Sequence, residues 1–419
     1  MSIAQIVESV VDGPLPLRIE AFDGSVAGPE GWPRRMRIDT PRGVAYLATA
    51  PGDLGLARAY VAGDLSLEGV HPGDPYDLLV DLASVRFHRP GLEEMLELSR
   101  TIGFRGLTPP PPPPQETLPR WRRVAEGVRH SMTRDARAIQ HHYDVSNRFY
   151  EMVLGPSMTY TCACYPTPDA SLEDAQENKY RLVFDKLGLE PGDRLLDIGC
   201  GWGGMVRYAA RRGVSVLGVT LSQQQALWGQ KAIADEGLSD LAEIRHSDYR
   251  AVTETGFDAV SSIGLTEHVG VRNYPAYFGF IRDRLRDGGL LLNHCITRPH
   301  NRPLSTGPFI DRYVFPDGEL TGSGRIITEA QDAGLEVLHE ENLREHYALT
   351  LAGWCANLVE HWDECVEEVG EGTSRVWGLY MAGSRLGFER NDVQLHHVLA
   401  VKPGAGGRHG LPLRPWWTA

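Results

Sequence analysis

Short apolar runs alternate with helically spaced segments through the C-terminal two thirds of the chain. Five runs rich in β-branched and apolar residues are RLLDIGC (194–200), VSVLGVT (214–220), AEIRHSD (242–248), FDAVSSIG (257–264) and GLLLNHCIT (289–297). Such alternation predicts βαβ units, and therefore an α/β fold with a mostly parallel sheet and helices on both faces. Two later runs, LEVLHEENL (335–343) and VQLHHVLAV (393–401), predict two further strands.

The N-terminal part of the chain has a different pattern and no catalytic motif. LRIEAFDGS (17–25) and RMRIDTPRGVAYLAT (35–49) predict short strands, whereas DLGLARAYVAGDL (53–65) and DPYDLLVDLASV (74–85) predict helices. Six consecutive prolines, Pro109–Pro114, predict a stiff polyproline II spacer. We therefore expect a small N-terminal α+β domain over 1–107, a linker over 108–120 and the α/β domain over 121–419.

Composition narrows the class of protein. A chain of 419 residues with 42% hydrophobic and 23% charged residues is typical of a soluble globular protein of two domains. With no basic leader and no apolar stretch of about 20 residues, we expect a cytoplasmic protein. The six cysteines contain no CxxC pair, which favours reduced thiols over disulfides or zinc, and Cys162 and Cys164 alone are weak support for a metal site.

The net negative charge argues against nucleic acid and, for the chain as a whole, against anionic membranes, but one segment is basic. A net charge of −13 argues against a nucleic-acid partner, which needs a basic surface. One segment has a net positive charge instead. RWRRVAEGVRHSMTRDAR (120–137) carries six arginines and only two acidic residues, Glu126 and Asp135. Such a run is either a solvated helix face or a contact for lipid phosphates. We expect this run or the N-terminal domain to touch the inner face of the membrane.

A glycine-rich loop follows the first of the five runs. In LLDIGCGWGGMVRYA (195–209), Gly199, Gly201 and Gly204 satisfy the dinucleotide fingerprint G-x-G-x-x-G. A dinucleotide-binding fold also needs an acidic residue about 20 positions further on to hold the ribose. The next run ends instead in Thr220, Leu221 and a serine, without a carboxylate.

The carboxylate stands before the loop. The order D-x-G-x-G-x-G, formed by Asp197, Gly199, Gly201 and Gly203, is followed by TLSQQQ and later by SDY. A phosphate group binds best at a helix N-terminus that no bulky side chain covers, but the loop here holds the bulky Trp202. S-adenosylmethionine carries an ammonium and a sulfonium but no phosphate, so it does not need such an uncovered helix N-terminus. This pattern favours a class I methyltransferase over an NAD enzyme, although Asp197 as a simple turn cap is compatible with both.

Longer stretches carry a family resemblance. HHYDVSNRFYEMVLGPSMTYTCACY (141–165), LTEHVGVRNYPAYF (265–278) and FIDRYVFPDGEL (309–320), together with DIGCGWGG and TLSQQQ, resemble the cyclopropane-fatty-acid synthase family, which methylates double bonds of lipid acyl chains. The resemblance is strong from about residue 120 to the C-terminus and looser before it. The whole chain is also similar to the actinobacterial methyltransferases of tuberculostearic acid synthesis, which implies a methylene-branched product rather than a cyclopropane.

The resemblance implies two groups of site residues. The residues implied to hold a bound bicarbonate, the base of the reaction, are Cys162, Glu267, His294, Ile296 and Tyr347. Those implied around S-adenosylmethionine are Tyr160, Thr161, Gly199, Gly201, Thr220, Leu221, Gln225, Asp248 and Tyr249. Each has a plainer interpretation, such as a buried cysteine for Cys162, core packing for Tyr347, a helix cap for Thr220 and a solvated side chain for Gln225.

Other features bear on product and access. Cys164 and Thr266 depart from the family pattern beside the expected cation. Residues 297–325 are expected to form a lid over the acyl chain. The terminal Trp416 and Trp417 are expected either at a membrane interface or in a disordered tail.

The leading hypothesis is a C-methyltransferase that acts on an unsaturated, oleoyl-type acyl chain of a phospholipid and gives a methylene-branched chain, with S-adenosylmethionine and bicarbonate as cofactors. The first alternative is a cyclopropane synthase. The others are an O- or N-methyltransferase of a small molecule and a non-catalytic lipid-binding protein. The resemblance also implies a homodimer and a partner reductase that saturates the methylene product.

Overall fold

The chain forms two compact units. The computed structural model describes residues 2–87, 91, 96, 97, 100, 108–117, 145–302 and 304–418. Unit 1 consists of Met1–Pro119, Gly307–Pro316 and Leu351–Leu386, and unit 2 consists of Arg120–Thr306, Asp317–Thr350 and Gly387–Ala419. The arginine run of residues 120–137 lies outside the described residues.

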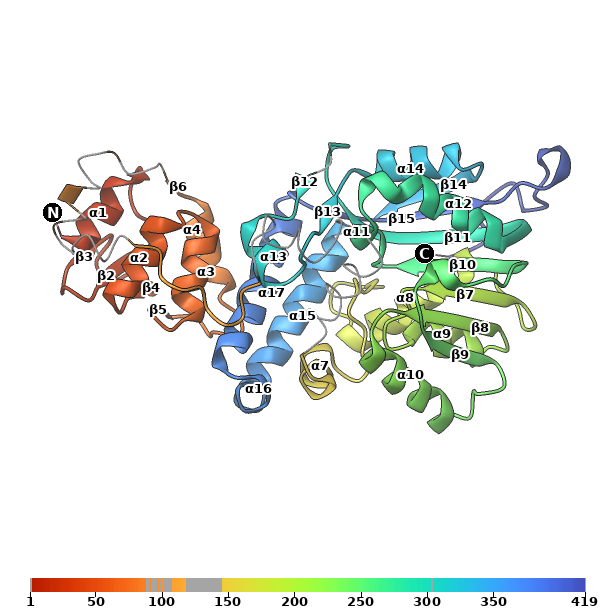
Figure 1. Ribbon diagram of the computed structural model, residues 1–419, viewed down its shortest axis with the longest axis horizontal. Helices are drawn as coiled ribbons and strands as arrows, with labels where there is room; N and C mark the ends of the chain where they lie inside the picture. The colour runs from red at the N-terminus through yellow and green to blue at the C-terminus, as the bar shows by residue number, and fades with distance from the viewer. Residues whose placement is uncertain are drawn as a thin grey trace. The chain divides into compact units, whose positions relative to one another are not determined.

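Unit 2 is built on a seven-stranded sheet (Figure 1). Its strands are β7 (Arg194–Ile198), β8 (Ser215–Thr220), β9 (Ala242–His246), β10 (Phe257–Ile263), β11 (Leu285–Thr297), β14 (Glu336–Asn342) and β15 (Gln394–Val401). They lie in the order β14-β15-β11-β10-β7-β8-β9. Only β15 runs antiparallel to its neighbours, so the predicted mostly parallel sheet is confirmed.

Helices cover both faces of this sheet because its strands are apolar on both sides. Leu195 belongs to the core beneath α8 (Leu172–Lys186), α9 (Gly204–Ala210) and α10 (Gln223–Asp235). Leu196, the next residue, belongs to the core beneath α12 (Tyr274–Arg284) and α14 (Ser323–Asp332). Side chains alternate along a strand, so consecutive apolar residues supply both cores. The other helices of unit 2 are α7 (Asn147–Leu154), α11 (Thr266–Val269), the 3-10 turns η2 (Tyr249–Ala251), η3 (Val271–Asn273) and η4 (Ala405–Gly407), and the start of α15 (Arg344–Glu360).

Unit 1 holds a four-stranded sheet in the order β3-β2-β4-β5. Its elements are α1 (Ile3–Ser9), β1 (Val11–Asp12), β2 (Arg18–Ala21), β3 (Val26–Ala27), β4 (Arg35–Ile38), α2 (Pro41–Thr49), α3 (Asp53–Val61), β5 (Leu65–Glu68), α4 (Tyr76–Ala83) and β6 (Arg86–Phe87), which pairs with β1. The prediction of a strand over residues 35–49 was wrong beyond Ile38. Thr40 accepts a hydrogen bond from the backbone N–H of Gly43, and Pro41 occupies the first turn, which together start helix α2.

Unit 1 also contains residues from the second half of the chain, which the predicted boundary at residue 121 did not foresee. These are α13 (Pro308–Tyr313), α16 (Trp362–Val369), and most of α15 and α17 (Glu371–Glu389). Leu379 of α17 packs against the N-terminal core, which explains the assignment. The predicted lid region, 297–325, therefore divides, with α13 in unit 1 and the paired strands β12 (Leu304–Ser305) and β13 (Glu319–Leu320) in unit 2.

The proline-rich segment is attached to unit 1. The hydroxyl of Tyr46 donates to the carbonyl of Pro111 at 2.5 Å. Glu116, whose side chain is fully buried, forms an ion pair with Arg58 at 2.6 Å and another with Arg312 of α13. One carboxylate thus joins the proline-rich segment to two other parts of unit 1.

We expect Glu116→Ala to lower the free energy of unfolding by about 3–5 kcal/mol, because it leaves two nearly buried guanidinium groups without their carboxylate. Urea denaturation followed by circular dichroism measures this. Glu68→Ala removes a half-exposed carboxylate of the same unit and should cost less than about 1 kcal/mol. Equal losses in the two variants would contradict the assigned role.

The tryptophan pair at the C-terminus is partly buried against the core of unit 2, so the expectation of a disordered tail was wrong, while a place at a membrane interface stays a prediction. The indole N–H of Trp416 donates to the carbonyl of Asp185 at 2.9 Å. The ring of Trp417 lies 5.1 Å from the ring of His339, and both indoles pack against the core of unit 2. Their apolar area is removed from water by α8 and β14.

The six cysteines are all buried and free. Among the helices of the described residues, none combines the length and the hydropathy needed to cross a bilayer.

Candidate active site

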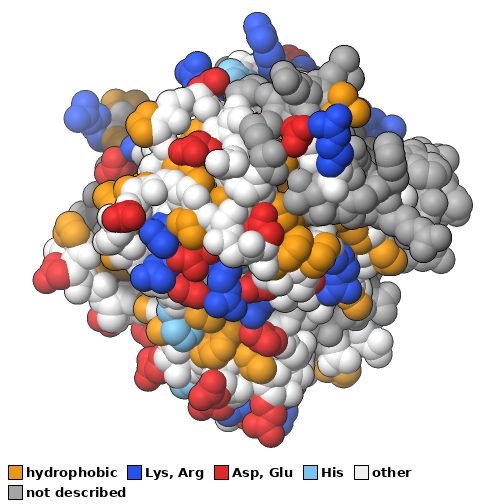
Figure 2. All heavy atoms as spheres, turned by 90° about the vertical axis from the view of Figure 1, so that its left-hand side faces the viewer, with side chains coloured by type: hydrophobic (Ala, Val, Ile, Leu, Met, Phe, Trp, Pro, Cys, Tyr) orange, Lys and Arg blue, Asp and Glu red, His pale blue; other side chains and the backbone are white. Residues whose placement is uncertain are grey.

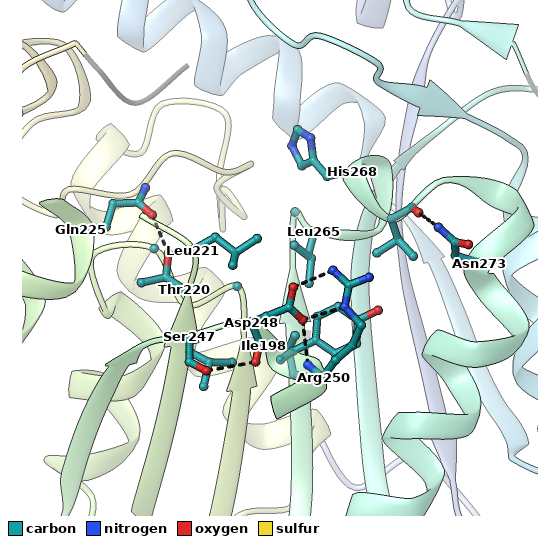
Figure 3. Close-up of a pocket in the computed structure, with 16 residues that line it drawn as sticks. Ile198, Thr220, Leu221, Gln225, Ser247, Asp248, Arg250, Leu265, His268 and Asn273 are labelled. Carbon is teal, nitrogen blue, oxygen red and sulfur yellow. Dashed lines mark hydrogen bonds and ion pairs between the residues drawn. The ribbon is translucent and has the colours of Figure 1, made fainter. Parts of the chain in front are cut away.

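The order of the large sheet reverses between β7 and β10, which are neighbours in space. In open α/β sheets, ligands bind outside the carboxyl ends of the strands at such a reversal. A pocket lies there, lined by residues at or after the ends of β7, β8, β9 and β10 (Figure 3). Of the residues predicted around the cofactor, it contains Gly199, Gly201, Thr220, Leu221, Gln225, Asp248 and Tyr249.

A second pocket continues from the first. It contains the predicted residues Tyr160, Thr161 and Asp197, and shares Gly199, Gly201, Gln225 and Gly264 with the first pocket. Gly203 lies outside both linings. It precedes α9 with a φ of +79°, and a Cβ there would lie 2.5 Å from Ile244, so this glycine serves the turn itself.

Thr220 and Gln225 form part of the pocket floor. The Thr220 hydroxyl donates to Gln225 Oε1 at 2.9 Å, and both residues are buried. The cap of α10 is Ser222, which accepts from the backbone N–H of Gln225. The plainer interpretations, a capping threonine and a solvated glutamine, are therefore wrong.

The sequence analysis missed several lining residues. Arg250 forms an ion pair with Asp248 at 2.6 Å, while Leu265 and His268 follow the end of β10. Figure 3 shows the side chains of Leu221 and Leu265 on opposite sides of the pocket, with His268 beyond Leu265. The signal for Leu265 and His268 was their position directly after a predicted parallel strand.

A buried acid and a buried amine lie at the second pocket. Asp197 accepts a hydrogen bond from Ser261 at 2.6 Å, and burial raises the pKa of its carboxyl to about 6. Lys179, which sequence reasoning missed, donates to Thr161 and to Gln176 at 2.9 Å each, and burial lowers the pKa of its ammonium to about 7. A carboxylate at this pocket suits a ligand with cationic groups.

Three of the predicted catalytic residues meet at the ends of β10 and β11. Glu267, in α11, accepts a hydrogen bond from the backbone N–H of Ile296 at 2.5 Å. His294 stands two residues before Ile296 on β11 and therefore on the same face of the sheet. The carbonyl of His294 accepts from the backbone N–H of Gly264, which lines both pockets.

Two buried polar atoms of this group have no hydrogen-bond partner among the described residues. They are Glu267 Oε2 and His294 Nε2. Burial raises the pKa of the Glu267 carboxyl to about 7. Burial and the nearby Lys179 and Lys186 hold the pKa of His294 well below its usual range, so this imidazole is neutral. Unpaired polar groups in a protein interior are costly and mark a place where a polar ligand fits.

Cys162 and Tyr347 lie on a neighbouring part of unit 2. The thiol of Cys162 donates to the carbonyl of Ala163 at 3.1 Å, and burial raises its pKa well above the usual value, so it is not a thiolate. Tyr347 is buried in α15, with its ring 4.5 Å from that of Phe388. Leu343, just before α15, donates to the carbonyl of Leu395, whose strand partner is Ile296. The start of α15 is thereby connected to the strand that carries His294.

Comparisons with known proteins agree on one family. Residues 130–398 match the family model described as mycolic acid cyclopropane synthetase. A probable fatty acid methyltransferase of Mycobacterium tuberculosis is 67% identical over 100% of this chain and 98% of its own length. The tuberculostearic acid methyltransferase UfaA1 of the same organism is 31% identical over 93% of this chain and 88% of its own. Among solved structures, the mycolic acid cyclopropane synthase CmaA1 complexed with SAH and CTAB has a TM-score of 0.60 at 31% identity, covering 64% of this chain and 98% of that one.

Proposed function

The chain belongs to the mycolic acid cyclopropane synthetase family of S-adenosylmethionine-dependent lipid methyltransferases, and from this we propose that it methylates the double bond of an oleoyl-type acyl chain in a phospholipid. The product is a methylene-branched, 10-methylene stearoyl chain. The observation that supports this chemistry most directly is that Glu267 Oε2 and His294 Nε2 are both buried and have no hydrogen-bond partner among the described residues, while the carbonyl of His294 accepts from Gly264, which lines both cofactor pockets.

The residues present fit S-adenosylmethionine. Asp197 supplies a buried carboxylate at a pocket whose floor includes Gly201, where a Cβ would meet open space. Asp248 and Tyr249 supply a carboxylate and an aromatic ring at the other pocket. When bound, the cofactor supplies an electrophilic methyl group. Attack by an alkene on that methyl leaves a carbocation on the acyl chain, which must be kept from water and must lose a proton.

The residues also fit a small anion with one proton. The site offers a carboxylate oxygen at Glu267 and an imidazole nitrogen at His294, and neither has a partner among the described residues. Bicarbonate, when bound, supplies the base that accepts the proton of the cation. Glu267 would then accept a hydrogen bond from the hydroxyl of the bicarbonate, while Cys162 and Tyr347 complete the proposed enclosure.

The choice of product depends on whether a hydride shifts before the added methyl loses its proton. A hydride shift followed by loss of a proton from the added methyl gives the methylene chain, whereas loss of that proton with direct ring closure gives a cyclopropane. The test is to incubate the protein with oleoyl-phospholipid vesicles and methyl-labelled cofactor and to analyse the released fatty esters. Absence of label from lipid would overturn the proposal, and mass fragmentation distinguishes methylene from cyclopropane products.

The rate should depend on pH through Glu267. Because burial raises the pKa of this carboxyl to about 7, the carboxylate acceptor predominates only above that pH. We expect turnover to rise as the pH increases through about 7, and we expect this rise to be absent in Glu267→Gln.

The raised pKa of Glu267 also affects folding stability. The protonated side chain stabilises the folded state fully below the ordinary pKa of 4.5, and this stabilisation is lost as the pH rises through about 7. Initial rates and denaturation midpoints across this range measure the two effects, and a wild-type rate that is flat through pH 7 would contradict the assignment.

The proposed substrate also requires access to lipid. Unit 1 contains a cavity of about 440 Å³ lined mainly by aliphatic side chains, including Leu56, Leu78 and Leu82. On the face shown in Figure 2, hydrophobic side chains reach the surface between basic and acidic ones.

We propose three partners for this protein. They are the membrane, contacted peripherally through unit 1 or the arginine run, a second copy of the chain in a homodimer, and a separate reductase that saturates the product. If vesicle binding is unchanged when Arg122, Arg123 and Arg129 become Gln, the contact through the arginine run is excluded.

A further inference from the structure

A row of polar groups leads away from His294 of the active site, and its other three members are not used by the proposed chemistry. We call the set Glu341, Lys186, His397 and His294 the lysine–histidine chain. Glu341 Oε2 lies 2.5 Å from Lys186 Nζ, and Lys186 Nζ lies 3.1 Å from His397 Nδ1. His397 Nε2 lies 2.8 Å from His294 Nδ1. Lys186 and both histidines are buried, whereas Glu341 at the far end is partly exposed.

We propose that Lys186 fixes the tautomer of both histidines, so that His294 presents an N–H donor at Nε2 to the anion of the active site. Lys186 is thus a positioning residue, which acts on the anion only through His397 and His294. The identity of the anion as bicarbonate rests on the proposed function, but the direction of the hydrogen bonds does not.

The direction follows from the groups themselves. An ammonium has three donors and no acceptor, and Lys186 Nζ forms an ion pair with Glu341 at 2.5 Å. His397 Nδ1 must therefore accept. A neutral imidazole has one donor and one acceptor, so His397 carries its hydrogen on Nε2 and donates it to His294 Nδ1. His294, in turn, carries its hydrogen on Nε2.

Both rings must be neutral for these donors and acceptors to hold, and their surroundings favour the neutral form. The groups that act on His397 besides burial are Lys186, Lys179, His294 and His339, all of them basic, and they hold its pKa well below the usual range. Lys179 and Lys186 act on His294 in the same direction. The Glu341 carboxylate, whose Oε2 lies 4.0 Å from His397 Nδ1, is already paired with Lys186 at 2.5 Å, so a second positive charge in this row would have no carboxylate of its own.

His294, at the end of the row, belongs to the proposed anion site together with Glu267, which accepts a hydrogen bond from Ile296 two residues further along β11. His294 Nε2 is buried and has no partner among the described residues, and Glu267 Oε2 is in the same condition. A donor and an acceptor of this kind fit a hydrogen carbonate ion, which has oxygens that accept and one hydroxyl that donates. The opposite tautomers would turn a lone pair of His294 toward the anion and repel it.

The test reads the tautomers directly. In protein with ¹⁵N-labelled histidine, long-range ¹H–¹⁵N spectra distinguish a ring nitrogen that carries hydrogen from one that does not, and His294→Gln and His397→Gln variants assign the signals. We expect both rings of the wild type to carry hydrogen on Nε2 at neutral pH. Hydrogen on Nδ1 of either ring would overturn the proposal, even if no variant of Lys186 folds.

Variants of Lys186 test the cause. Lys186→Met should move part or all of the hydrogen to Nδ1 in both rings, whereas Lys186→Arg, which also only donates, should retain the wild-type pattern. Lys231→Met is the matched control, since this lysine is exposed on α10 and pairs only with Asp235 among the described residues. An unchanged pattern in Lys186→Met would overturn the proposal.

A second measurement connects the tautomers to the anion. In buffer depleted of carbon dioxide, the bicarbonate concentration for half-maximal methylation should rise about tenfold or more in Lys186→Met, because a donor to a charged acceptor is lost. The KM for S-adenosylmethionine should not change. Reversed tautomers in an active lipid methyltransferase would overturn the inference and leave the proposed function intact. Conversely, the expected tautomers in a protein that does not label lipid would support the inference about Lys186 and overturn the proposed function.

Discussion

Replacing Glu267 with glutamine is expected to slow lipid methylation by about 10²–10⁴-fold, the usual contribution of general base catalysis, because the proposed base loses the carboxylate that holds it. The side chain keeps its size and can still accept from the backbone N–H of Ile296 through its amide oxygen. What it loses is the carboxylate oxygen Oε2, which is buried without a partner among the described residues. Rates with labelled cofactor and oleoyl-phospholipid vesicles measure the loss.

The control for this variant is Glu177→Gln, which changes an exposed carboxylate on α8 and should leave the rate within about twofold. Affinity for S-adenosylhomocysteine, measured by calorimetry, should be the same in both variants and the wild type, because Glu267 is absent from both pocket linings. An O- or N-methyltransferase of a small molecule does not need the buried carboxylate. Near-normal turnover of Glu267→Gln would therefore favour that alternative.

Replacing Gly201 with leucine is expected to weaken binding of S-adenosylhomocysteine by about 100-fold or more. Steric overlap between the new side chain and the ligand should cost about 3 kcal/mol of binding free energy, which corresponds to that change in Kd. Gly201 lines both pockets, and a Cβ there meets no protein atom within 4 Å. The added side chain would therefore occupy pocket space rather than collide with the protein. Calorimetry measures the affinity.

Gly237→Leu is the matched control for backbone strain. Gly237 has a φ of +69°, similar to the +55° of Gly201, and a Cβ there also meets nothing within 4 Å. It lies after the end of α10 and is exposed. Both variants should lose about 1–2 kcal/mol of folding stability from a left-handed leucine, but only Gly201→Leu should lose affinity. Equal affinities would show that the cofactor lies elsewhere.

The sequence predicted the sheet of unit 2 well because its central strands β7, β10 and β11 are nearly continuous apolar runs, buried on both faces. The segment after Arg35 was harder, since its strand passes within three residues into a helix that begins at Pro41. Local pattern also could not show that α17 belongs with the N-terminal core, because that depends on contacts between residues far apart in the chain.

The spacing of residues in the sequence predicted only part of the candidate site. The glycine loop and Asp197 identified a cofactor pocket, but Cys162, His294 and Tyr347 were joined only through the family resemblance. Lys186 and His397 carry no local signal at all, since one is a helix residue and the other a strand residue in apolar surroundings. Their hydrogen bond bridges 211 positions of the sequence, and the pattern around either residue is that of ordinary core.

The discontinuity of unit 1 limits how this enzyme can be recombined with its relatives. Its residues come from three separate stretches, two of which lie inside the region matched by the family model. A chimera that exchanges only the first 119 residues would separate the new N-terminal core from Leu379, and the new residue at position 116 from Arg312. Transplanting this unit therefore means exchanging Gly307–Pro316 and Leu351–Leu386 together with residues 1–119.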